Sequence, residues 1–154
     1  MRWNMKKIAI PIICLLVITA LFCSCSHKGE ITDVLRTAKT VLINGEEVKT
    51  VEAKMGAFQG SQGDKIEFIF DEPHAINTVY IVEKTATVRQ FNIYAKIDGK
   101  DTLVYTDKLI AAQNLQFDTV TAEALTVEIL NTEIGSNGFI IQGISAYEIP
   151  QEVK

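Results

Sequence analysis

The stretch Phe91-Asn-Ile-Tyr-Ala-Lys-Ile97 alternates apolar and polar residues along its whole length. Successive side chains of a β-strand point to opposite faces, so this pattern predicts a strand that buries its apolar positions on one side. Asp98-Gly99 follows directly, and this dipeptide suits a two-residue turn. The turn leads to a second short β-branched and aromatic run, Leu103-Val-Tyr105. This part of the chain is therefore expected to form a β-hairpin with one buried face.

The same signal recurs on both sides of the hairpin. Apolar residues alternate, or β-branched residues cluster, in four more segments, which are residues 65–70, 77–82, 124–130 and 139–149. Gly143 lies within the last segment, where a bulge would let the strand bend. Several strands with no long helical period between them indicate an antiparallel sandwich or barrel. The predicted fold class is all-β.

The region before residue 65 is less decisive. Residues 31–42 have apolar residues at helical spacing behind a possible cap at Thr32, but Thr40-Val-Leu-Ile43 could equally be a strand. Asn44-Gly45 then predicts a tight turn. Residues 46–55 are expected to form the return strand.

Five stretches together resemble a known family, and they are Asp64–Pro73, Ile76–Glu83, Val88–Ala95, Ala122–Asn131 and Gly138–Glu148. Their order is similar to that of the galactose-binding-like jelly roll found in discoidin domains (coagulation factor type C) and in many bacterial carbohydrate-binding modules. The central pair is especially similar to the sandwich domain appended to bacterial α-fucosidases. The resemblance covers about residues 63–149 and implies a jelly-roll β-sandwich over residues 31–154. It also implies a non-catalytic carbohydrate-binding role.

Residues 1–24 have the pattern of a secretory leader. Met1–Lys7 is basic, and an apolar run of 16 residues, Ile8–Cys23, follows it. That run is shorter than the roughly 20 residues that a membrane-spanning helix needs, so a signal peptide is favoured over an uncleaved anchor. Phe22-Cys-Ser-Cys25 resembles a bacterial lipobox, which implies lipidation at Cys25, with Cys23 as the alternative. Residues 25–30 would then be a tether, and the protein is expected in the cell envelope, at the outer membrane of a Gram-negative bacterium.

Composition excludes several classes of function. Beyond residue 25 the chain has 12 Lys and Arg against 19 Asp and Glu, a formal charge of −7, which disfavours nucleic acid as a partner. All three cysteines lie at or before Cys25, so a disulfide framework, a thiol catalyst and a cysteine-bound zinc are excluded beyond it. Within the expected globular part, residues 31–154, one histidine occurs, His74, and it is expected to be exposed in a turn. No serine lies in a Gly-x-Ser-x-Gly elbow, and the chain is not expected to be an enzyme.

Two loops are the candidate ligand sites. In Gly56–Asp64, Phe58 could stack on a sugar face, and Gln59, Gln62 and Asp64 could bond its hydroxyl groups. The alternative is a connector whose Phe58 packs back on the sandwich. In the loop at residues 131–138, an ordinary turn competes with a binding role, and the resemblance offers as candidates Asn131, Glu133 and Asn137.

The remaining expectations concern cofactors and partners. Family members often hold calcium in an Asp-rich loop that ends at a tryptophan, but residues 45–63 contain no such motif. The only tryptophan is Trp3, which lies in the expected leader. Because the loop motif is missing, no cofactor is expected. Calcium is the one ion that the resemblance allows. Glu83 and Arg89 flank a short connection and are expected to form an ion pair. The partner would be a glycan or, alternatively, another envelope protein that the sandwich docks on, with the membrane reached through the N-terminal lipid.

Overall fold

The computed structural model describes residues 31–108, 110 and 112–150, and the expected leader, Cys25 and the tether lie outside them. The described residues form two short helices and eight strands, which are the 3₁₀ helix η1 (Val34–Thr37), β1 (Thr40–Ile43), β2 (Glu46–Glu47), the helix α2 (Val51–Lys54), β3 (Phe58–Gly60), β4 (Lys65–Glu83), β5 (Val88–Ile97), β6 (Lys100–Asp107), β7 (Ala112–Thr132) and β8 (Phe139–Tyr147). These described residues belong to one compact unit. Among the described residues, none of the helices has the length and apolar character needed to cross a membrane.

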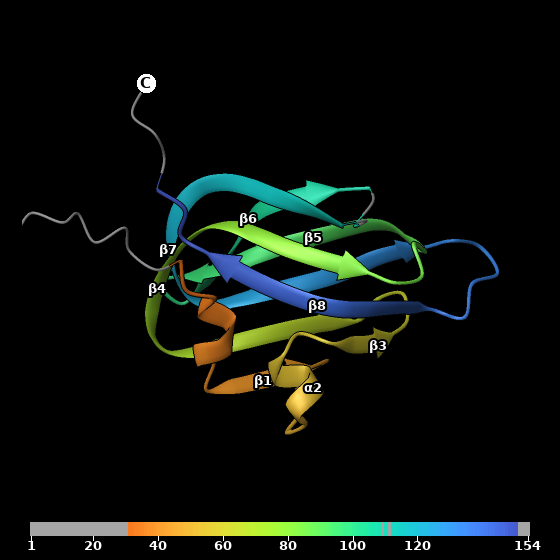
Figure 1. The fold of residues 1–154 in the computed structure, drawn as a ribbon, viewed down its shortest axis with the longest axis horizontal. Coiled ribbons are helices and arrows are strands. Elements are labelled where there is room, and N and C mark those ends of the chain that lie inside the picture. Colours follow the sequence, from red (N-terminus) through yellow and green to blue (C-terminus); the bar gives the residue numbers. More distant parts are fainter. Residues whose placement is uncertain (1–30, 109, 111, 151–154) are drawn as a thin grey trace, which may run out of the picture. The chain divides into compact units, whose positions relative to one another are not determined.

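The strands form an antiparallel β-sandwich because β4 and β7 each contribute to both layers (Figure 1). The first half of β4 pairs with β1 and with the second half of β7, which in turn pairs with β5. The second half of β4 pairs with β8 and with the first half of β7. The register between β4 and β7 shifts between Ile69 and His74, a segment that includes Pro73. Proline has no N–H group to donate, so the ladder is interrupted where the long strands pass from one layer to the other.

The core lies between the two layers and is made of the residues that alternation predicted. Phe68, Phe91, Leu125 and Ile129 are buried from one layer, and Ile81, Ile141 and Ile144 from the other. The predicted turns are also confirmed. Asn44-Gly45 and Asp98-Gly99 have positive φ at both residues and join adjacent antiparallel strands. The register of β4 and β8 shifts by one residue beside Gly143, which confirms the predicted bulge.

In the N-terminal region the structure has both the helix and the strand that were predicted as alternatives, and one other prediction is wrong. The segment from residue 31 begins as η1, capped by Asp33 rather than by Thr32, and continues as β1. The expected return strand over residues 46–55 is wrong, since β2 contains only Glu46–Glu47 and α2 follows. The Thr50 hydroxyl accepts a hydrogen bond from the backbone N–H of Ala53 at 3.1 Å, which caps the first turn of α2. This capping interaction favours a helix over the return strand that the Asn44-Gly45 turn suggested.

Candidate functional site

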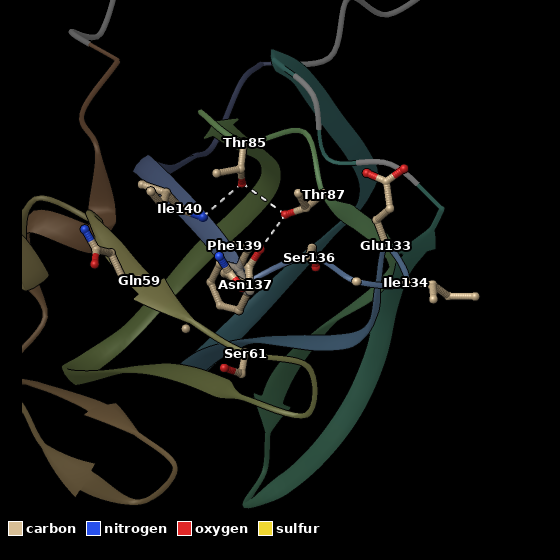
Figure 2. Close-up of a pocket in the computed structure, with 13 residues that line it drawn as sticks. Gln59, Ser61, Thr85, Thr87, Glu133, Ile134, Ser136, Asn137, Phe139 and Ile140 are labelled. Carbon is tan, nitrogen blue, oxygen red and sulfur yellow. Dashed lines mark hydrogen bonds between the residues drawn. The ribbon is translucent and has the colours of Figure 1, made fainter.

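Three connecting segments line a pocket of about 720 Å³ at one end of the sandwich. They are β3 with the residue after it, the β4–β5 turn and the β7–β8 loop (Figure 2). We call this site the loop pocket, and its lining residues are Gln59, Gly60, Ser61, Thr85, Thr87, Glu133, Ile134, Gly135, Ser136, Asn137, Gly138, Phe139 and Ile140. The β7–β8 loop lies at the right in Figure 1, whereas η1 and the end of β8 lie towards the left.

The carboxylate of Glu83, at the end of β4, organises the wall formed by the β4–β5 turn. One oxygen, Oε1, accepts hydrogen bonds from the backbone N–H groups of Thr87 (2.7 Å) and Val88 (3.1 Å) and from the Thr85 hydroxyl (2.8 Å). Hydrogen bonds to a charged acceptor are stronger than neutral ones. Glu83 therefore fixes this turn, and the expected Glu83–Arg89 ion pair is wrong because backbone and hydroxyl donors of the turn occupy the carboxylate.

Two hydroxyl groups of the turn connect it to the chain that leads into β8. The Thr87 hydroxyl lies 2.8 Å from the carbonyl oxygen of Gly138, and the Thr85 hydroxyl accepts from the backbone N–H of Ile140 at 3.0 Å (Figure 2). The two hydroxyl oxygens are themselves 3.1 Å apart. This part of the pocket is thus positioned by a continuous series of hydrogen bonds that begins at Glu83.

Arg89 connects the same turn to the β7–β8 loop. Its Nη2 lies 3.1 Å from Oε2 of Glu133, and its Nη1 donates to the carbonyl oxygens of Ala86 (2.8 Å) and Val88 (3.2 Å). Three acceptors therefore hold the guanidinium group. Among the described residues that line the loop pocket, Glu133 is the only one with a formal charge.

A close approach of two backbones forms the opposite wall. Gly60 of β3 is paired with Phe139 of β8, and a Cβ atom at Gly138 would collide with the Gly60 carbonyl oxygen. Gly138 also has a φ of +101°, which residues with a side chain rarely adopt. Glycine at this position therefore lets the β7–β8 loop pass against β3 and close that side of the pocket.

The structure brings some of the sequence-predicted site residues together and leaves others apart. Gln59, Glu133 and Asn137 line the loop pocket, although they come from two loops far apart in the sequence. Gln62, Asp64 and Asn131 are not among its lining residues.

Asp64 has a structural role in its own loop. Its carboxylate accepts from the backbone N–H of Ser61 at 2.7 Å and from the side-chain amide of Asn44 at 2.8 Å. These two bonds hold the segment after β3 against the β1–β2 turn. The carboxylate is therefore already engaged within the chain.

The expected stacking role of Phe58 is wrong. Its ring is only 5% exposed and packs edge-on against Phe68, with centroids 5.9 Å apart. The register that pairs Phe58 with Ile141 turns its ring to the core, which is the alternative that the sequence left open. Phe139 is the one aromatic residue among the lining residues, and it is 2% exposed. The loop pocket therefore lacks an exposed aromatic platform.

His74 also differs from expectation, because it lies within the bounds of β4 and is half-buried. Its Nε2 is 3.1 Å from the Thr37 hydroxyl of η1, and its ring is packed edge-on against Phe70. In the described part of the chain, no group of three or more His, Cys, Asp and Glu side chains is arranged to hold a metal ion. His74 thus connects η1 to the sandwich.

Several polar groups of the pocket have no partner among the described residues. The side-chain amides of Gln59 and Asn137 are exposed, and no hydrogen bond joins them to another described residue. The hydroxyl oxygen of Ser136 is buried and also has no partner there. Sequence reasoning missed Ser61, Thr85, Thr87 and Ser136. By sequence these are ordinary turn residues, and only the meeting of the loops brings their hydroxyl groups to one pocket. The pocket can offer both donors and acceptors to a polar ligand.

Two lysines with shifted pKa values lie away from the loop pocket, on the outer face of the layer that contains β5 and β6. A hydrogen bond with Glu128 raises the pKa of Lys65, and one with Glu67 raises the pKa of Lys96. The corresponding N···O distances are 3.0 and 3.1 Å. Both lysines and Glu67 border a second, smaller hollow of about 370 Å³, in which each lysine is already paired.

Comparison with solved structures identifies the fold. The family 32 carbohydrate-binding module of NanJ from C. perfringens, solved in complex with galactose, has a TM-score of 0.58 and 15% identity, and the match covers 77% of this chain and all of that one. Chitosan-binding module 1 of a chitosanase/glucanase from Paenibacillus sp. IK-5 has a TM-score of 0.61 and 16% identity, covering 76% of this chain and 99% of that one.

A putative α-L-fucosidase from Bacteroides thetaiotaomicron has a TM-score of 0.61 and 17% identity over 76% of this chain, but the match covers only 28% of the enzyme. A second one from the same organism is 22% identical, with a TM-score of 0.53 over 62% of this chain and 22% of its own. No protein-family model matches the sequence, and no curated protein matches it significantly. The matches that span whole solved chains are binding modules by name, and those to fucosidases span about a quarter of those chains. This chain therefore has a mostly antiparallel β-sandwich fold that resembles the galactose-binding-like fold of family 32 carbohydrate-binding modules.

Proposed function

We propose that this protein is a non-catalytic carbohydrate-binding module that holds a glycan in the loop pocket. The observation that supports the proposal most strongly is that two loops singled out from sequence meet at one pocket, with unpartnered amide and hydroxyl groups in it. Sugars present a rim of hydroxyl donors and acceptors, which such groups can bond. The likeness to modules named for chitosan binding and solved with galactose adds support.

The recognition mechanism relies on hydrogen bonds rather than on aromatic stacking. Gln59 and Asn137 each supply an amide with one acceptor and two donor hydrogens, and Ser61 adds a hydroxyl group. Ile134 is fully exposed on the β7–β8 loop and supplies the apolar surface for a sugar's C–H face. Without an aromatic platform we expect modest affinity for a single sugar and tighter binding when several protein copies meet a polymer.

A glycan array probed with the full chain tests the proposal. Binding to a group of related glycans, weakened on substitution of Asn137, supports a carbohydrate-binding module. A blank array from a folded sample contradicts it, and crosslinking in the native envelope would then test docking on a partner protein.

We also propose that the chain is a lipoprotein anchored through Cys25 in the outer membrane. The basic segment, the short apolar run and the lipobox-like Phe22–Cys25 support this proposal. Incorporation of labelled fatty acid, followed by membrane fractionation, tests it. Cys25→Ala should abolish labelling and release the protein, whereas Cys23→Ala should leave both unchanged. The reverse result would move the lipid to Cys23, and labelling of neither form would contradict the anchor.

A further inference from the structure

From the charges around the loop pocket, and resting on the proposed carbohydrate binding, we infer that the ligand is a neutral or amine-bearing glycan and that Glu133 excludes anionic sugars. Of the described residues that line the pocket, Glu133 is the one with a formal charge. No Lys, Arg or His is among the lining residues in the part of the chain that the structure describes. A ligand carboxylate or sulfate entering the pocket would lose water without gaining a cationic partner, which is unfavourable.

Arg89 is the nearest candidate for such a partner, and the structure shows why it is not free. Its guanidinium group is 3.1 Å from the Glu133 carboxylate and donates to the carbonyl oxygens of Ala86 and Val88. The Glu133 backbone N–H also donates to the carbonyl oxygen of Thr87 at 2.7 Å, so the two charged residues approach each other from two hydrogen-bonded segments. Lys84, in the same turn, is exposed and does not line the pocket.

The pair is arranged with its negative partner at the pocket. Glu133 lines the cavity and Arg89 does not, so a ligand meets the carboxylate before the guanidinium group. The side chains are 37% and 56% exposed for Arg89 and Glu133, so water and salt screen the field and the discrimination is moderate. We expect a neutral glycan to bind about three- to tenfold more tightly than its carboxylated counterpart at low salt. A ligand ammonium group, in contrast, can pair with Glu133.

The test is an array of neutral, amine-bearing, uronate-containing and sialylated glycans, probed with the full chain at low and high salt. The expected hits are neutral or amine-bearing. In Glu133→Gln the lining residues have no formal charge and Arg89 loses its ionic partner, so signals from uronate and sialylated glycans should rise about three- to tenfold, more at low salt than at high salt. Glu46→Gln, an exposed change of the same charge in β2 outside the pocket, should leave the pattern as it is.

The outcomes separate the two proposals. Hits dominated by anionic glycans, or an unchanged pattern in Glu133→Gln, contradict the charge inference and leave carbohydrate binding supported. A blank array with every form of the protein contradicts the proposed function itself, and the charge inference with it. Thermal unfolding of both variants checks that a lost signal does not come from a lost fold.

Discussion

At the end of the sandwich that contains η1, polar side chains form hydrogen bonds within the chain. At the loop-pocket end, in contrast, several polar side chains have no partner in the described chain. Asn77 is 3% exposed, and its amide both donates to the carbonyl oxygen of Ile149 (2.8 Å) and accepts from its N–H (2.9 Å). Asp33 accepts from the backbone N–H groups of Leu35 and Ala146. At the other end, the side chains of Gln59, Asn137 and Ser136 make no hydrogen bond to another described residue.

The comparison distinguishes polar groups that stabilise the protein from those that are available to a ligand. Burying a polar group without a partner is costly, so a fold tends to satisfy its buried polar groups internally. Polar groups left unpaired at the loop pocket form no hydrogen bond that stabilises the folded chain by itself. We therefore expect substitutions at the η1 end to change stability and substitutions at the loop pocket to change binding.

The largest effect should come from Asn77→Ala. The change removes four hydrogen bonds and leaves the N–H and carbonyl groups of Ile149 without their side-chain partner. We expect the free energy of unfolding to fall by about 2–4 kcal/mol, measured by urea denaturation. Asn114→Ala, an exposed asparagine of β7, is the matched control and should cost less than about 0.5 kcal/mol. Equal costs for the two changes would contradict the structural role of Asn77.

Glu83→Gln should affect both properties, because Glu83 positions one wall of the pocket through the turn. Loss of the charge weakens the bonds from Thr87 and Val88, and we expect a cost of about 1–3 kcal/mol with a loss of glycan affinity. Glu72→Gln makes the same charge change at an exposed position of the same strand and should alter neither. Denaturation and binding isotherms on the same samples measure the two effects. A stable Glu83→Gln protein with normal affinity would show that the turn does not depend on this carboxylate.

Phe58→Leu should reduce stability without reducing affinity. The Phe58 ring is buried against Phe68, so a smaller side chain leaves unfilled space that costs about 1–2 kcal/mol. Because the ring does not face the pocket, the dissociation constant for a glycan identified on the array should stay within about twofold. A twofold change corresponds to about 0.4 kcal/mol, less than half of the energy of one neutral hydrogen bond. A large loss of affinity in a folded variant would restore Phe58 as a ligand contact.

Asn137→Ala should show the converse, with unchanged stability and weaker binding. Its exposed amide has no partner in the described chain, and loss of one hydrogen bond to a ligand corresponds to about 1 kcal/mol, or roughly a fivefold change in affinity. Asn131→Ala provides the matched control, since Asn131 is exposed near the same loop but does not line the pocket. Calorimetry with the same glycan should separate the two variants. Equal effects would place the binding site outside the loop pocket.

The strands could be predicted from sequence because alternation is a local signal. The face that buries Phe91, Ile93 and Ala95, both Asx-Gly turns and the bulge at Gly143 each depend on a few neighbouring residues. The helix α2 was missed although it has a local signal, the capping Thr50, because the Asn44-Gly45 turn suggested a return strand through the same residues. Here two local preferences competed, and the hydrogen bond to the helix end prevailed.

The site was harder to predict because its geometry depends on contacts between distant segments. Both loops were identifiable by their Gly, Asn and Gln content, but only the pairing of β3 with β8 brings Gln59 and Asn137 to one pocket. The same pairing turns Phe58 inward. Sequence spacing also suggested an ion pair for Glu83, and it gave no information on the backbone N–H groups that the carboxylate contacts instead.

The smallest effect should come from substitution of a paired lysine on the outer face. This change tests whether ion pairs away from both ends of the sandwich contribute to stability. The hydrogen bond with Glu67 raises the pKa of Lys96, so the pair stabilises the fold at pH values below the ordinary lysine pKa of 10.5. That contribution disappears as the pH rises through the raised value, because the lysine then loses its charge in the folded state as well. Since Lys96 is 33% exposed, Lys96→Met should cost less than about 1 kcal/mol at pH 7, and the cost should vanish above the raised pKa. Urea denaturation of both forms at neutral and strongly alkaline pH measures it, and a cost independent of pH would show that Lys96 stabilises the sheet by packing rather than by its charge.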